Sequence, residues 1–146
     1  MPSNDFTITR RVQFAETDAA GVLHFANYFR MMEEVEHAFW RSLGHSVWFH
    51  DGDGVISWPR VHCTCEYASP AKFEDELSLT FRVARMGKRS VTFEVDFHRD
   101  GLRIASGRTK AACCAIRDGA FRSIAIPDNV RCVLRPFVAD QASAAP

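Results

Sequence analysis

The longest amphipathic pattern in the chain lies between Glu16 and Gly44, and it limits what the rest of the sequence can fold into. Apolar side chains recur there at helical spacing, which predicts one long helix. They are Tyr28, Met32, Val35, Phe39 and Leu43, with Phe25, Phe29 and Trp40 widening the apolar stripe. Gly44 suits the position just after the helix, where glycine readily adopts a left-handed conformation. A helix with so wide an apolar face needs a covering surface, which we expect the remaining chain to supply.

Composition indicates one ordinary globular domain. The chain has 146 residues, of which 47% are apolar and 25% charged, and its 18 basic residues balance 18 acidic ones. A chain of this length can bury a core without disulfides or metal, and a zero net charge gives no support for a nucleic-acid partner. We predict a single domain over residues 1–138 and a disordered tail over 139–146.

The cysteines and the termini restrict the cellular setting. The five cysteines match neither a zinc-site spacing nor a disulfide framework. The N-terminus has no basic segment followed by an apolar run, and no apolar stretch approaches the roughly 20 residues of a spanning helix. We therefore expect a cytoplasmic protein with reduced core thiols, no membrane segment, no metal and no cofactor.

Alternation of apolar and polar residues predicts five strands, at about residues 6–14, 55–67, 77–83, 91–97 and 102–116. The third and fourth form a hairpin around Gly87, and residues 45–54 are expected to be a loop. Pro127 suits the start of a short terminal helix that Pro136 would stop. One strand, a long helix and four strands in a meander predict an α+β fold, with one helix on one antiparallel sheet.

Three motifs together resemble a known family. Residues 17–28 follow the pattern T-D-x-x-G-V-x-x-x-x-N-Y, which joins a turn of small residues to the helix start. The segment EYASPAKFEDEL follows at residues 66–77, and Gly-Lys-Arg-Ser precedes a strand at residues 87–90. Over about residues 6–117 the chain resembles the hotdog-fold acyl-CoA thioesterases of the 4-hydroxybenzoyl-CoA thioesterase family.

The resemblance implies a five-stranded antiparallel sheet wrapped around one long helix. It also implies a homodimer or homotetramer whose active sites are lined by two subunits. The chain departs from many relatives at one position: they carry Tyr or His seven residues after the aspartate, where this chain has Phe25, and its histidine is His24. Relatives that act on 1,4-dihydroxy-2-naphthoyl-CoA are similar in carrying Phe there.

Thioester hydrolysis needs little more than this turn and helix start can provide. An alkyl thiol, with a pKa of about 8.5, is a good leaving group, so the enzyme must supply a nucleophile and stabilise the carbonyl oxygen. Asp18 can act as general base or nucleophile, and the Phe25 N–H, near the helix start, can polarise the carbonyl. The alternative is that Asp18 only caps its turn. His24 is a candidate to orient Asp18, to contact substrate or to bond a loop carbonyl.

Other residues are candidates for substrate binding. Asn27 suits either a substrate contact or the first turn of the helix, and Phe29 is a candidate for the acyl pocket. Glu33 is the alternative base, although an ion pair with Arg30 or with an interface arginine would also explain it. Lys88 and Arg89, at the hairpin tip, could bind the phosphates of coenzyme A, or simply aid solubility.

We therefore expect an acyl-CoA thioesterase that forms free acid and CoA. The expected substrates include CoA thioesters of aromatic acyl groups, such as 4-hydroxybenzoyl or 1,4-dihydroxy-2-naphthoyl. Two alternatives remain open: a hotdog dehydratase of hydroxyacyl thioesters that uses His24 with Asp18, and a non-catalytic acyl-CoA-binding module.

Overall fold

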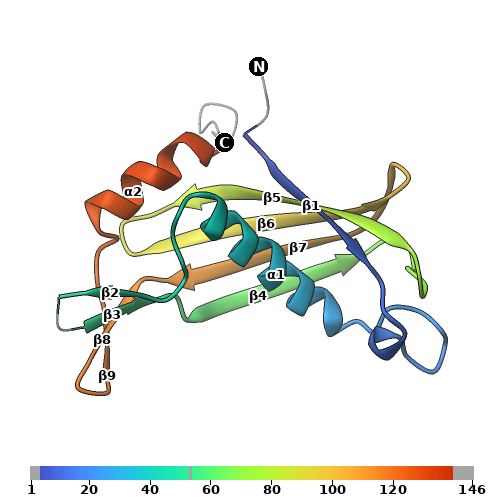
Figure 1. Ribbon diagram of the computed structural model, residues 1–146, viewed down its shortest axis with the longest axis horizontal. Coiled ribbons are helices and arrows are strands. Elements are labelled where there is room, and N and C mark those ends of the chain that lie inside the picture. The colour runs from blue at the N-terminus through green and yellow to red at the C-terminus, as the bar shows by residue number, and fades with distance from the viewer. Residues whose placement is uncertain (1–3, 53, 140–146) are drawn as a thin grey trace.

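The computed structural model describes residues 4–52 and 54–139, which form two antiparallel sheets and two α-helices (Figure 1). The larger sheet has five strands in the order β1-β5-β6-β7-β4. Their bounds are β1 Phe6–Arg11, β4 Arg60–Tyr67, β5 Glu76–Met86, β6 Ser90–Arg99 and β7 Leu102–Ala112. All four neighbouring pairs are antiparallel. The predicted α+β class and five-stranded antiparallel sheet are confirmed.

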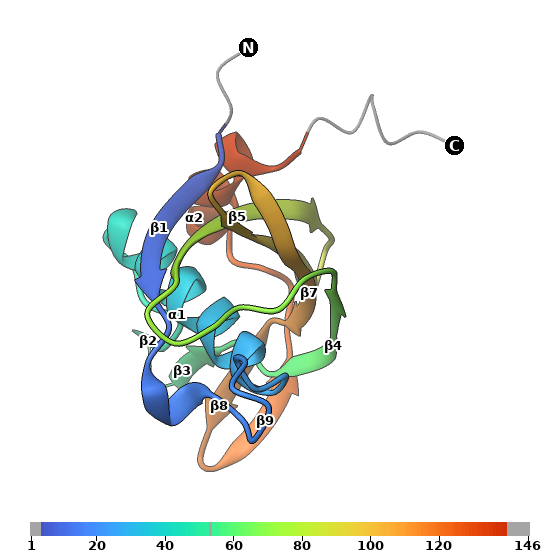
Figure 2. The ribbon, with the colours of Figure 1, turned by 90° about the vertical axis from the view of Figure 1, so that its right-hand side faces the viewer.

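Helix α1, Asn27–Ser42, lies on the concave side of this sheet (Figure 2). Its buried face packs on β5, where the Phe39 and Phe81 ring centroids are 4.6 Å apart. On β7, a Cβ added to Gly107 would lie 2.3 Å from the Met32 Sδ, so glycine lets the helix approach the sheet closely. The helix ends as predicted, because Gly44 follows it with a φ of 76°.

Phe25 does not belong to the apolar stripe of the helix. It precedes α1, and the residue is 62% exposed. The prediction that it widens the buried stripe was wrong, whereas Trp40 is fully buried.

The smaller sheet was not predicted. Its strands, in the order β2-β3-β8-β9, are β2 Phe49–Asp51, β3 Gly54–Ser57, β8 Cys114–Arg117 and β9 Ala120–Ser123. The strand predicted over 55–67 breaks at Pro59, which has no N–H to donate to a ladder. The strand predicted over 102–116 breaks at Cys113, whose N–H donates to the Arg89 carbonyl. The predicted loop over 45–54 contains β2, and residue 53 lies outside the described residues.

Two further predictions about the strands were wrong. Strand β4 pairs with β7 rather than with β5, so only β5, β6 and β7 form a meander and β4 lies at an edge of the sheet. The first strand ends at Arg11, because the Gln13 N–H donates to the Glu16 carboxylate at 2.7 Å and begins a short 3-10 helix, η1 Phe14–Glu16.

The C-terminal segment packs beside β5. Helix α2, Asp128–Leu134, follows Pro127 as predicted, and a 3-10 turn that contains Pro136, η2 Arg135–Phe137, ends it. The Ala139 N–H donates to the Val83 carbonyl at 2.9 Å, and the rest of the predicted tail, residues 140–146, lies outside the described residues. Within the described chain, no helix is long and apolar enough to cross a membrane.

The cysteines differ from the expected core thiols. All five are free within the described residues, but only Cys113 and Cys114 are buried. Cys63 and Cys132 are exposed, because β4 and α2 lie at the periphery of the fold.

Candidate active site

Asp18 lies in a tight turn that its own carboxylate stabilises. The Asp18 Oδ1 accepts hydrogen bonds from the Ala20 N–H at 2.9 Å and the Val22 N–H at 3.3 Å. Gly21 has a φ of 79°, a conformation that glycine adopts without strain. Among the described residues, Oδ2 has no hydrogen-bond partner. The carboxylate therefore caps the turn with one oxygen and leaves the other available.

A loop between β4 and β5 holds this turn in place. The Leu23 N–H donates to the Ala71 carbonyl at 2.7 Å, and Val22 forms an antiparallel bridge with Lys72. The loop is itself fastened by Arg99 of β6, which donates to the Asp75 carboxylate at 2.7 Å. Burial alone would raise the pKa of Asp75, but the Lys72 N–H and Arg99 outweigh it and lower that pKa.

The residues that lead into α1 expose one backbone donor. The His24 N–H bonds the Glu16 carbonyl at 2.9 Å, the Ala26 N–H bonds the His24 Nδ1 at 3.1 Å, and the Asn27 N–H bonds the His24 carbonyl at 2.9 Å. The Phe25 N–H has no hydrogen-bond partner among the described residues. It lies just before the first turn of α1, where the helix dipole favours negative charge.

Asp18 and Phe25 line the same pocket, which has a volume of about 350 Å³. The other lining residues are Val22, Leu23, Tyr28, Tyr67, Ala68, Ser69 and Pro70. Burial raises the pKa of Tyr28 to about 12 and also raises the pKa of Tyr67, so both hydroxyls stay protonated near neutral pH. The sequence motif that ends at residue 77 already contained Tyr67, but nothing in the sequence indicated that Tyr67 lies in the same pocket as Asp18.

His24 and Asn27 lie beside this pocket without lining it. The His24 ring stacks on the Phe25 ring with centroids 4.4 Å apart, and its Nδ1 accepts a backbone hydrogen bond. The Asn27 Nδ2 donates to the Glu16 carbonyl at 2.9 Å, so this side chain fastens the helix start to the 3-10 turn. Within the described residues, the His24 and Asn27 side chains thus both form hydrogen bonds with the backbone.

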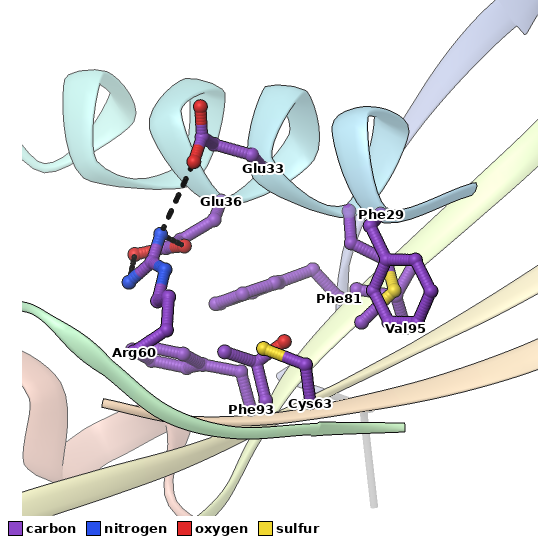
Figure 3. Close-up of a pocket in the computed structure, with 10 residues that line it drawn as sticks. Phe29, Glu33, Glu36, Arg60, Cys63, Phe81, Phe93 and Val95 are labelled. Carbon is purple, nitrogen blue, oxygen red and sulfur yellow. Dashed lines mark hydrogen bonds and ion pairs between the residues drawn. The ribbon is translucent and has the colours of Figure 1, made fainter. Parts of the chain in front are cut away.

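Glu33 and Phe29 line a second cavity, of about 120 Å³, between α1 and the sheet (Figure 3). Arg60 of β4 reaches into it, pairs closely with the buried Glu36, and lies 3.8 Å from the Glu33 carboxylate. Burial raises the pKa of Glu36, which Arg60 offsets only in part. Within one chain, Glu33 therefore pairs with Arg60 and lies in a different cavity from Asp18.

The turn between β5 and β6, which contains Lys88 and Arg89, lies beside α2 at the opposite end of the sheet from the segment that leads into α1 (Figure 1). The Arg89 Nη1 donates to the Ser123 carbonyl at 3.1 Å, and Arg131 of α2 donates to the Gly87 carbonyl at 2.9 Å. The Lys88 backbone carbonyl accepts the Ile126 N–H at 2.9 Å. A single subunit does not bring these two cations to the Asp18 pocket.

Comparison with known proteins gives the fold and the family that the sequence motifs predict. The family model described as the Thioesterase superfamily matches residues 20–106. A protein of Aquifex aeolicus, provisionally named an esterase, is 32% identical over 132 residues, which cover 89% of this chain and 98% of that protein. A 1,4-dihydroxy-2-naphthoyl-CoA hydrolase of Prochlorococcus marinus is 27% identical, with 88% of each chain covered.

A solved structure extends this agreement. BH1999 gentisyl-coenzyme A thioesterase has a TM-score of 0.73 at 29% identity, covering 89% of this chain and 99% of that one. The fold is thus the hotdog fold of thioesterases. The chain belongs to the Thioesterase superfamily, and the predicted relationship is confirmed.

Proposed function

We propose that this protein hydrolyses an acyl-CoA thioester, with Asp18 as the base or nucleophile and the Phe25 N–H as the donor to the carbonyl oxygen. One observation supports this most strongly. A carboxylate with an unpartnered oxygen and a backbone N–H without a partner among the described residues line a single open pocket at a helix start.

The chemistry can follow either of two routes. With Asp18 as general base, a water oxygen attacks the thioester carbon while a proton of that water passes to the carboxylate, and the C–S bond then breaks to release the CoA thiolate. With Asp18 as nucleophile, the carboxylate forms an anhydride and expels the CoA thiolate, and water then hydrolyses the anhydride. In both routes a tetrahedral intermediate places negative charge on the former carbonyl oxygen, which the Phe25 N–H and the helix dipole would stabilise.

An aromatic acyl group is the substrate class that we propose. The Asp18 pocket has aromatic walls, because Phe25, Tyr28 and Tyr67 line it. Flat aromatic surfaces suit a planar acyl group. Two relatives are named for aromatic acyl-CoA substrates, naphthoyl in one and gentisyl in the other. Substrate contacts by Asn27 and Phe29, and a supporting role for His24, stay predictions.

A dimer would complete the site. Strand β4 lies at an edge of the sheet and most of its residues are exposed, so pairing with a second copy would satisfy its free backbone groups. Antiparallel pairing of β4 with its copy brings the Tyr67 end of one strand to the Arg60 end of the other.

This pairing also accounts for the position of the two cations. Arg60 and Val91 both align with Ala111 of β7, so the Lys88–Arg89 tip lies at the end of the sheet where β4 begins. In such a dimer the tip of one subunit lies at the Asp18 end of the other and could bind the CoA phosphates there. We propose a homodimer or homotetramer of a single hotdog domain, residues 1–138, whose sheet wraps around α1, working in the cytoplasm.

A panel of CoA thioesters with thiol detection tests the proposal. The panel contains 4-hydroxybenzoyl-CoA, 1,4-dihydroxy-2-naphthoyl-CoA, gentisyl-CoA, a short aliphatic acyl-CoA and a 3-hydroxyacyl-CoA. We expect free CoA from one or more aromatic members. Dehydration of the 3-hydroxyacyl-CoA without thiol release would indicate the dehydratase instead, and binding without any turnover would indicate the binding module.

A further inference from the structure

The hydroxyl of Tyr67 connects the end of β4 to the backbone just before α1. It donates to the Phe25 carbonyl oxygen at 2.9 Å, between residues that are far apart in the sequence. Tyr67 is the last residue of β4 and lines the pocket that also contains Asp18. This hydrogen bond therefore crosses the proposed active site.

The Tyr67 ring is held independently of its hydroxyl. Its edge meets the Tyr28 ring with centroids 5.0 Å apart, and the buried Tyr28 packs in turn on Phe97, with centroids 5.2 Å apart. The half-exposed Tyr67 ring is thus supported on one side by a buried ring of the hydrophobic core. Substituting phenylalanine at this position would remove the hydrogen bond and keep the ring.

The hydrogen bond acts on the proposed donor of the oxyanion site. The peptide that contains the Phe25 N–H is anchored where the His24 carbonyl accepts the Asn27 N–H at 2.9 Å, and the next peptide is anchored where the Tyr67 hydroxyl donates to the Phe25 carbonyl. Fixing the peptides on both sides of Phe25 leaves little freedom in its φ and ψ angles, and so fixes the direction of its N–H. A donor aimed in advance at the developing charge needs no reorganisation during the reaction.

We propose that Tyr67 is a positioning residue for thioester hydrolysis, because its hydrogen bond to the Phe25 carbonyl oxygen holds the Phe25 N–H in the direction that stabilises the oxyanion. This inference rests on the proposed function. Tyr67 itself forms and breaks no covalent bond during thioester hydrolysis.

The test compares Tyr67→Phe with the wild-type protein, using 4-hydroxybenzoyl-CoA and the panel thioester that is hydrolysed fastest. Loss of an oxyanion donor costs about 10²–10³-fold in kcat, so a donor that is present but less well aimed should cost about 10-fold. KM should change little, because the hydrogen bond acts on the transition state. Thr7→Val is the matched control, since it removes another exposed hydroxyl hydrogen bond, to Thr80 at 3.1 Å, away from the pocket.

A spectroscopic measurement separates positioning from a general loss of stability. In an Asp18→Asn background, bound thioester should persist, and the Raman band of its ¹³C-labelled carbonyl reports the polarisation of that bond. Adding Tyr67→Phe should move the band back toward its position in solution, while Thr7→Val should leave it unchanged.

The outcomes distinguish this inference from the proposed function. If the wild-type protein releases thiol, Asp18→Asn does not, and Tyr67→Phe matches the wild-type kcat with an unmoved carbonyl band, the positioning role is wrong and the proposed function stands. A fall in kcat that only follows a lowered melting temperature would also overturn the positioning role. If the wild-type protein releases no thiol from any panel member, both fail.

Discussion

Arg99 of β6 donates to the Asp75 carboxylate at 2.7 Å, and the same guanidinium donates to the Pro70 carbonyl at 3.1 Å. This pair fastens the β4–β5 loop to the sheet, and the backbone of that loop forms hydrogen bonds with the Asp18 turn. The lowered pKa of Asp75 means that the folded state favours its charged form.

The Asp75–Arg99 pair should therefore give a pH-dependent stability. Because the folded pKa lies below the ordinary value of 3.8, the contribution is fully present above that value and is lost as pH falls through the folded pKa. Asp75→Asn should lower the free energy of unfolding by roughly 1 kcal/mol at pH 7, a modest value for a partly exposed charged hydrogen bond. Urea unfolding at pH 7 and pH 3 measures it, and a difference between wild type and variant that persists undiminished at pH 3 would contradict this origin.

The free edge of β4 predicts self-association. Val61 of β4 is 58% exposed, and in the proposed dimer it would be covered by the second copy. Light scattering of the native protein at micromolar concentration should give two or four times the mass of one chain, and Val61→Asp should reduce it to the mass of one chain, because a charge would be buried at the interface. Phe121→Asp, at an exposed residue of β9, should leave the assembly intact. A native protein with only the mass of one chain would rule out the two-subunit site.

The hairpin tip predicts a substrate-dependent defect. Replacing both Lys88 and Arg89 by alanine should raise KM for an acyl-CoA several-fold and leave a short pantetheine thioester almost unaffected, because only the former has the phosphates. The defect should shrink as ionic strength rises, since salt screens exposed charges. An equal loss on both substrates would instead mean that the tip supports the fold, for example through the Arg89 bond to the Ser123 carbonyl.

Local patterns in the sequence predict some features well. The helical spacing of residues such as Val35 and Phe39 is unambiguous, and the glycine after the helix marks its end. The turn at Asp18 was visible as a run of small residues. The strand boundaries were harder, because the residues around Cys113 look like one continuous strand and the break depends on which carbonyl its N–H meets in space.

Long-range contacts could not be predicted from local patterns. The hydrogen bond between Tyr67 and Phe25 depends on how β4 crosses the sheet, which the sequence suggested wrongly. The partner of Glu33 also comes from β4, as Arg60, rather than from the neighbouring helix turn. The motif residues thus identified the Asp18 turn, and the tertiary fold supplied the neighbours that give it a pocket.

We expect Asp18 to perform the chemistry and Glu33 not to. Asp18→Asn keeps the size of the side chain and one hydrogen-bonding oxygen for the Ala20 and Val22 N–H groups, so it should remain folded with a loss of about 0.5–2 kcal/mol, the usual cost of a cap. It removes the charge and the basicity. Glu33→Gln is the matched control, because it makes the same change in the cavity that contains Arg60.

Steady-state hydrolysis of the best panel thioester by these two variants, with melting curves recorded beside the kinetics, is the most direct measurement. We expect kcat of Asp18→Asn to fall by at least about 10²-fold, the usual scale for a positioned base, while Glu33→Gln should change mainly the melting temperature. A folded Asp18→Asn protein that hydrolyses thioester near the wild-type rate, with Glu33→Gln inactive, would show that Glu33 is the base and that Asp18 only caps its turn.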